Sequence, residues 1–130
     1  MFKKKVLYLD EIELFFKKAE QNLKSSKLLY EEEDYSNSVT LSYYAMLLVS
    51  KGLLVKKGIT PRKHFGIITE FGRIYVHNGD FSLNIYRYLT TSQSLRDKSS
   101  YDAIDDITPL IAKQNINNAQ EYIQEGKKFL

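Results

Sequence analysis

The sequence predicts an all-α protein, folded as an up-and-down antiparallel bundle of four to five helices. Apolar residues recur at three- and four-residue steps over long segments, which is the period of a helix with one buried face. Helix start and stop residues separate these segments, and short loops between helices favour antiparallel neighbours. The 130 residues, 43% hydrophobic and 27% charged, suit one domain with a single core over residues 1–130.

The first helix is predicted to begin at Asp10, because Asp10 and Glu13 have the spacing of a capping box. Its expected buried face consists of residues at helical spacing: Ile12, Phe16, Ala19, Leu23, Ser26 and Tyr30. The second helix is predicted over residues 35–57 and should be the most buried, since its apolar stripe is wide. Gly58 then follows two lysines, which is typical of a helix end, because glycine adopts the left-handed conformation at low cost.

Thr60 and Pro61 predict the start of a third helix, as its cap and its first helical residue. This helix should extend to about Val76. Gly66 and Gly72 lower its propensity but permit another helix to approach closely. A turn is expected over residues 77–80.

The fourth helix is predicted over residues 82–97, with Leu83, Tyr86 and Leu89 in one row. A loop should follow over residues 99–108. Thr108 and Pro109 repeat the start signal. The apolar positions of the fifth helix are then Leu110, Ala112, Ile116, Ala119, Ile123 and Leu130.

Composition excludes several classes of protein. The chain has no cysteine, which rules out a disulfide scaffold and is compatible with the cytoplasmic location that we expect. The apolar run after the N-terminal lysines ends at Asp10, so we expect no targeting segment. The longest apolar stretch, residues 43–50, is far shorter than the roughly 20 residues of a membrane-spanning helix. A net charge of +3 permits contact with phosphates without predicting it.

The familiar enzyme signatures are missing from the sequence. It contains no glycine-rich phosphate loop, no HExxH and no nucleophile elbow, and its two histidines, His64 and His77, are too dispersed for a metal site. We therefore expect no metal and no cofactor. His77 is interpreted as a turn residue, whereas His64, near a helix start, is either structural or functional.

Two segments could contact a phosphate. In the segment 96–101, the guanidinium of Arg96 could grip a phosphate near the phenol of Tyr101; alternatively, Arg96 neutralises the carbonyls at the helix C-terminus. Tyr43 and Tyr44 point about 100° apart on a helix, so one is expected in the core and the other at its rim. The alternative is that one ring lines a groove near a phosphate or stacks on a base.

These residues form part of a longer pattern that resembles the HEPN family, in particular its small one-domain archaeal and bacterial branch. The matching segments are Ala19 with Asn22-Leu23, Asp34-Tyr35 with Ser38-Val39, Ser42-Tyr43-Tyr44-Ala45-Met46, Gly52-Leu53-Leu54, Gly58 to His64 with Gly66, Phe71, and Arg96 before Ser100-Tyr101-Asp102. The Tyr-Tyr-Ala segment followed by the arginine and the Tyr-Asp pair is the most specific part.

The resemblance implies a helical bundle that usually forms a homodimer and, in many members, a metal-independent ribonuclease of a toxin-antitoxin system. Active members carry an arginine, a polar residue and then a histidine. Arg96 and Asp97 match the first two, and Tyr101 stands near the histidine position. Contacts to RNA or a nucleotide would come from Arg96, Tyr44 and Lys98.

The missing histidine bears on the rate of any cleavage. A tyrosine with a pKa of about 10 is a poor general base at neutral pH, where a histidine near 6.5 is well matched. His64 is the candidate substitute. In related systems the partner is a minimal nucleotidyltransferase antitoxin that modifies a tyrosine near this motif, so the resemblance makes Tyr101 a candidate acceptor. The alternative function is a non-catalytic helical interaction or nucleotide-binding module.

Overall fold

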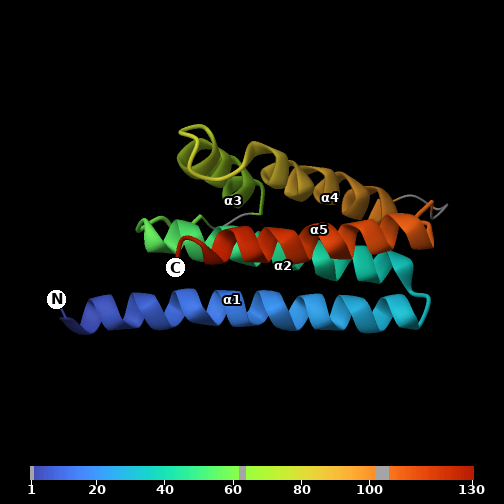
Figure 1. Ribbon diagram of the computed structural model, residues 1–130, viewed down its shortest axis with the longest axis horizontal. Coiled ribbons are helices and arrows are strands. Elements are labelled where there is room, and N and C mark those ends of the chain that lie inside the picture. Colours follow the sequence, from blue (N-terminus) through green and yellow to red (C-terminus); the bar gives the residue numbers. More distant parts are fainter. Residues whose placement is uncertain (1, 62–63, 102–105) are drawn as a thin grey trace.

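The computed structural model describes residues 2–61, 64–101 and 106–130, and the side chains of residues 10–61, 66–97 and 106–130. Within these ranges the chain forms helices α1 (Phe2–Glu31), α2 (Tyr35–Lys56), α3 (His64–Phe71), the π-helical turn η1 (Gly72–Val76), α4 (Leu83–Tyr101) and α5 (Pro109–Lys127). The long helices α1, α2 and α5 run along the length of the molecule, and α3 and α4 lie on the side opposite α1 (Figure 1). The predicted all-α bundle is confirmed.

Helix α2 is the centre of the bundle. It contacts each of the other four α-helices, and its stripe of Val39, Tyr43, Met46, Val49 and Leu53 is fully buried. By length and composition alone α2 could cross a membrane, but 72% of its most apolar window is buried inside the protein. The apolar surface of α2 is therefore that of a core helix, as predicted.

The start of α1 differs from the prediction. The helix begins at Phe2, so Asp10 lies inside it and does not form a capping box. Residues 2–9 contain neither glycine nor proline, and nothing in them stops a helix. The predicted buried face is confirmed from Ile12 to Ser26. Ser26 is accommodated there because its hydroxyl donates to the carbonyl of Ser38 on α2 at 2.5 Å.

The third helix begins at His64 rather than at Pro61, and its last turn is π-helical rather than α-helical. The hydroxyl of Tyr86 on α4 donates to the carbonyl of Ile68 at 2.8 Å. A Cβ atom on Gly72 would lie 2.6 Å from that hydroxyl oxygen, so Gly72 is required for this close approach. At Gly66 a Cβ atom would meet, among the described side chains, only the Cβ of Pro61, at an ordinary 3.6 Å.

We expect Gly72→Ala to lower the free energy of unfolding by roughly 1–2 kcal/mol, because the new methyl group displaces the Tyr86 hydroxyl from its hydrogen bond. Gly66→Ala is the matched control, and it should leave stability unchanged or raise it slightly through higher helix propensity. Urea unfolding followed by circular dichroism measures both. Equal stability of the two variants would show that Tyr86 does not constrain this turn.

Helix α4 extends to Tyr101, four residues beyond its predicted end at Asp97. The predicted loop is therefore wrong for residues 99–101, holds for residues 106–108, and lies outside the described residues at 102–105. The Arg96 motif is consequently inside a helix. Leu83 was also misplaced, since it is 50% exposed.

The start of α5 is as predicted. The Thr108 hydroxyl accepts a hydrogen bond from the backbone N–H of Ile111 at 3.1 Å, and Pro109 is the first helical residue. Two of its predicted apolar positions are wrong, because Leu110 and Leu130 are 78% and 59% exposed. The buried face instead includes Asn115, Tyr122 and Gly126. A glycine is needed at position 126, where a Cβ atom would clash with the side chain of Val49.

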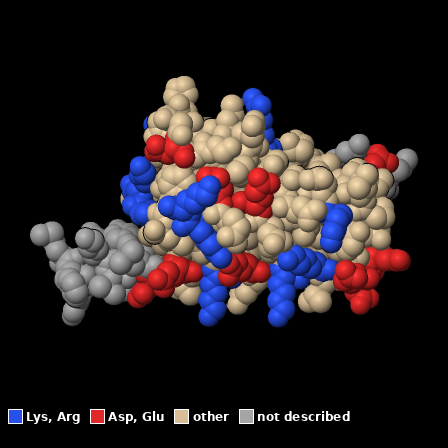
Figure 2. Space-filling view, in the orientation of Figure 1, with Lys and Arg blue, Asp and Glu red and all other residues tan. Residues whose placement is uncertain are grey.

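Charges of both signs are interspersed along α1 and over α5 on the face shown in Figure 2. One pair joins the two helices, with Lys127 Nζ 2.5 Å from Glu20 Oε1. Such a mixed face produces no strong field of one sign. Binding of a charged ligand would therefore depend on the local arrangement of side chains and not on the overall charge of the protein.

Candidate functional site

The candidate site is formed where α4 crosses α2. Arg96 of α4 lies over two adjacent rings of α2, with its Cζ atom 5.8 Å from the ring centroid of Tyr43 and 5.6 Å from that of Tyr44. Its Nη2 atom also donates to the Tyr44 hydroxyl at 3.1 Å. Cation–π contacts and a hydrogen bond therefore hold the guanidinium in one place.

The two tyrosines have different environments, as their adjacent positions on a helix predicted. Tyr43 is completely buried, and its hydroxyl has no hydrogen-bond partner among the described residues. Burial raises the pKa of Tyr43 to about 12, although Arg96 acts in the opposite direction. Tyr44 is half-buried, with its hydroxyl at the rim beside Arg96. Tyr43 thus supports the arginine from below, and Tyr44 orients it.

Asp97 is the second contact of Arg96. Its Oδ1 atom lies 3.3 Å from Nη1, and the side chains are 27% exposed for Arg96 and 47% exposed for Asp97. An ion pair of this exposure contributes little to stability. The alternative role for Arg96, neutralising the C-terminal carbonyls of its helix, is not what the structure shows, because α4 continues to Tyr101 and Arg96 turns toward α2.

A buried asparagine connects the two helices that carry the site. Asn115 of α5 is 3% exposed, and its Nδ2 atom donates to Ser42 Oγ on α2 at 2.6 Å and to Ser92 Oγ on α4 at 2.9 Å. Ser42 is two residues before Tyr44, and Ser92 is one helical turn before Arg96. Asn115 therefore sets the register between the guanidinium and its tyrosine partner.

The sequence profile of the HEPN domain matches residues 12–129. This chain belongs to the HEPN family. The match covers every element of the candidate site, including Tyr43, Tyr44, Arg96 and Asn115. The resemblance inferred from the Tyr-Tyr-Ala segment and the later arginine is confirmed at the level of the family.

Relatives of this HEPN domain occur in archaea and bacteria. Two proteins of Methanocaldococcus jannaschii, each named "putative toxin", are 29% and 35% identical to it. Those alignments cover 95% and 93% of this chain and 84% and 90% of the relatives. A UPF0332 protein of Pyrococcus horikoshii is 40% identical over 65% of this chain and 60% of its own length.

The predicted site residues of the HEPN domain fall into two groups. The structure brings together Arg96, Asp97 and Tyr44. Lys98 and Tyr101 lie further along α4, and His64 is the first residue of α3, but the side chains of these three lie outside the described ones. The backbone of Tyr101 follows that of Arg96 by five residues of α-helix, an axial distance of about 7.5 Å.

Two contributors to the site were missed in the sequence. Asn115 had a recognisable signal, because it is a polar residue on the apolar stripe of α5, between Ala112 and Ala119. Tyr43 was identified only as a core residue. Its role beneath Arg96 had no local signal, since the two residues are far apart in the sequence and only the packing of α4 on α2 joins them.

The buried tyrosines predict a loss of stability at alkaline pH. Burial raises the pKa of Tyr43 and of Tyr75 to about 12 and raises that of Tyr122 further. In the unfolded chain these phenols ionise near pH 10. Between about pH 10 and 12 the unfolded state thus binds fewer protons than the folded state, so the free energy of unfolding should fall as pH rises. Urea unfolding across this range measures the slope, which Tyr43→Phe should reduce; an unchanged slope would contradict the assignment.

Proposed function

We propose that this HEPN domain acts on RNA as a metal-independent endoribonuclease and serves as the toxin of a toxin-antitoxin pair. The observation that carries the proposal is the guanidinium of Arg96, which two rings and the Tyr44 hydroxyl hold at a partly exposed position. A planar, permanently charged fork matches the oxygens of a phosphate diester. The two similar proteins named "putative toxin" support the biological role.

The chemistry requires a cation but no metal ion. The 2′-hydroxyl of the ribose attacks the neighbouring phosphorus and loses its proton to a base, while the bond from phosphorus to the 5′-oxygen breaks and that oxygen takes up a proton. The products are a 2′,3′-cyclic phosphate and a free 5′-hydroxyl. Negative charge grows on the non-bridging oxygens in the transition state, and Arg96 is placed to stabilise it.

The second requirement is a base, and Tyr101 stands near the position at which active family members carry histidine. A neutral phenol removes a proton poorly at neutral pH, so the rate should be about 10²- to 10⁴-fold below that of a histidine-containing relative. We propose Tyr101 as the polar group at this position and His64 as the substitute base. Tyr101→His should then accelerate cleavage if Tyr101 occupies the place of the base.

The direct test is incubation of end-labelled RNA with the purified protein in EDTA, followed by analysis of the product ends. We expect slow cleavage that leaves 2′,3′-cyclic phosphate and 5′-hydroxyl ends. Products with a 5′-phosphate, or cleavage that stops in EDTA, would contradict the proposal. RNA binding without cleavage would favour the second candidate, a non-catalytic helical interaction or nucleotide-binding module, which the absence of the motif histidine supports.

The proposed assembly is a homodimer in which the two Arg96 motifs face a shared cleft, with a minimal nucleotidyltransferase as the antitoxin. In that system the Tyr101 hydroxyl would attack the α-phosphorus of ATP and release pyrophosphate, leaving a nucleotide ester on the phenol. Intact-mass measurement after incubation with ATP and a minimal nucleotidyltransferase of the proposed antitoxin class should show added nucleotide units in the wild type and none in Tyr101→Phe. An unchanged mass in both would exclude Tyr101 as the acceptor.

A further inference from the structure

A second feature adjoins the candidate site on the other side of Tyr44. It is a groove between α1, α2 and α3, with a volume of about 430 Å³. Its lining residues are Lys18, Gln21 and Asn22 from α1, Tyr44, Leu47, Leu48 and Lys51 from α2, and Ile67 from α3. We call it the α1–α2 groove. Tyr44 belongs both to this groove and to the contact with Arg96, so the groove and the site adjoin at this residue.

The floor and the rim of the α1–α2 groove differ in chemistry. Leu47 and Ile67 are almost completely buried and form an apolar floor. The rim carries two ammonium groups and two carboxamides, and none of the described lining residues is acidic. An apolar floor with a few polar groups at its edge is typical of a ligand site, and the volume lies within the usual range of roughly 300–1,000 Å³. The two lysines make an anionic ligand the best match.

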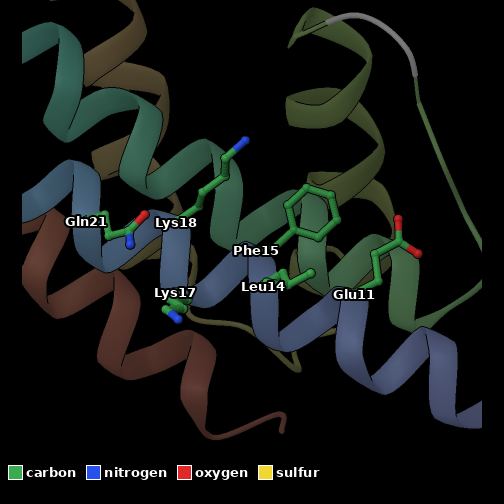
Figure 3. A pocket seen from close by; sticks show the side chains of 6 residues that line it. All are labelled: Glu11, Leu14, Phe15, Lys17, Lys18 and Gln21. Atoms are coloured by element: carbon green, nitrogen blue, oxygen red, sulfur yellow. The ribbon is translucent and has the colours of Figure 1, made fainter.

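One of the two groove lysines, Lys51, is held by a neighbouring ring. Lys51 Nζ lies 5.4 Å from the ring centroid of Phe15, a contact that restrains the ammonium without neutralising its charge. Figure 3 shows Lys18 and Phe15 projecting from α1 toward the side on which α2 and α3 lie. Lys17, the residue before Lys18 on α1, lines the neighbouring hollow in Figure 3 but not the groove. The chain therefore contains a matched exposed lysine outside the groove.

We infer that the α1–α2 groove binds the stretch of single-stranded RNA that flanks the phosphate held by Arg96. This inference rests on the proposed function and adds the substrate class. Lys18 and Lys51 contact backbone phosphates, and one unstacked base lies on the floor of Leu47, Leu48 and Ile67, with the amides of Gln21 and Asn22 at its edge. A duplex keeps its bases stacked inside and cannot place one on this floor, whereas single strands expose their bases.

The test uses a short, fluorescein-labelled 2′-O-methyl oligonucleotide of mixed sequence, which cannot be cleaved because the attacking hydroxyl is blocked. Fluorescence anisotropy gives its affinity at several salt concentrations for the wild type, Lys18→Gln, Lys51→Gln, the double variant and Lys17→Gln. We expect each groove variant to bind about fivefold more weakly and the slope of log affinity against log salt to fall by about 0.7 per lysine. Lys17→Gln should match the wild type, and circular dichroism confirms that all variants fold.

Three outcomes would overturn the inference. If the groove variants bind the oligonucleotide as tightly as Lys17→Gln does, while Arg96→Ala does not bind it, then the groove does not contact the RNA. The proposed function would still stand. If the groove variants weaken binding of a matched duplex as much as that of the single strand, the substrate class is wrong. If the wild type binds no oligonucleotide at all, the proposed function fails and the groove assignment fails with it.

Discussion

Arg96→Ala is expected to reduce the rate of RNA cleavage by about 10²- to 10³-fold, the loss typical of removing one group that stabilises developing charge. Circular dichroism and urea unfolding check that the variant folds, because Arg96 also packs on Tyr43 and Tyr44. Arg96→Lys should recover only a small part of the rate, since an ammonium group cannot bind two phosphate oxygens as a fork. Single-turnover cleavage of labelled RNA in EDTA measures these rates.

The matched control is Arg87→Ala. Arg87 lies on the same helix and is exposed, so its removal changes the net charge by the same amount without touching the candidate site. We expect wild-type cleavage from this variant. Equal losses in the two alanine variants would show that the effect of Arg96 is one of overall charge and not of its position on Tyr43 and Tyr44.

A large loss of stability outside the aromatic core is expected from Asn115→Leu, at about 1–3 kcal/mol. The leucine fills a similar volume, but the buried Ser92 hydroxyl loses the hydrogen bond from Asn115, and a buried polar group left unsatisfied costs about that much. The Ser42 hydroxyl also loses Asn115, but it still donates to the carbonyls of Ser38 and Val39. Urea unfolding measures the loss. Adding Ser92→Ala should restore part of the stability, because it removes the unsatisfied hydroxyl.

Asn115→Leu should also slow cleavage by about tenfold at a temperature where it is fully folded, because the register between Arg96 and Tyr44 is relaxed. The fall should appear in kcat more than in KM if the substrate still binds. Gln114→Leu, at an exposed neighbouring amide of the same helix, is the control and should change neither stability nor rate greatly. If the Asn115→Leu variant is destabilised but keeps the wild-type kcat, the hydrogen bonds of Asn115 with Ser42 and Ser92 support the fold and do not contribute to cleavage.

Local signals in the sequence predicted those parts of the fold that depend on local contacts. Thr108 caps α5, and Gly58 follows the end of α2 with a φ of +79°, because each effect acts within one turn of chain. The prediction for α3 failed where a distant residue intervenes. Its π-helical turn coincides with the approach of Tyr86, and no pattern within residues 60–76 contains that information.

The same division applies to the candidate site. The periodicity of the sequence predicted that Tyr43 lies in the core and Tyr44 at its rim. It could not predict that Arg96 packs on both rings, because a helical pattern shows which face is buried and not which residues of another helix contact it. The groove had a partial signal, since Tyr44, Leu48 and Lys51 recur at the spacing of one helical stripe. The contribution of Lys18 depends on the packing of α1 against α2 and was not predictable from its own segment.

The central claim is that the guanidinium of Arg96 contacts the phosphate backbone of RNA. The most direct measurement is the side-chain NMR spectrum of arginine-labelled protein, in which the four arginines of the chain give Nε–H signals and Arg96→Lys assigns that of Arg96. On addition of the uncleavable 2′-O-methyl oligonucleotide, we predict a large shift of the Arg96 signal and little change in that of Arg87. Binding of the oligonucleotide with the Arg96 signal unmoved would contradict the claim.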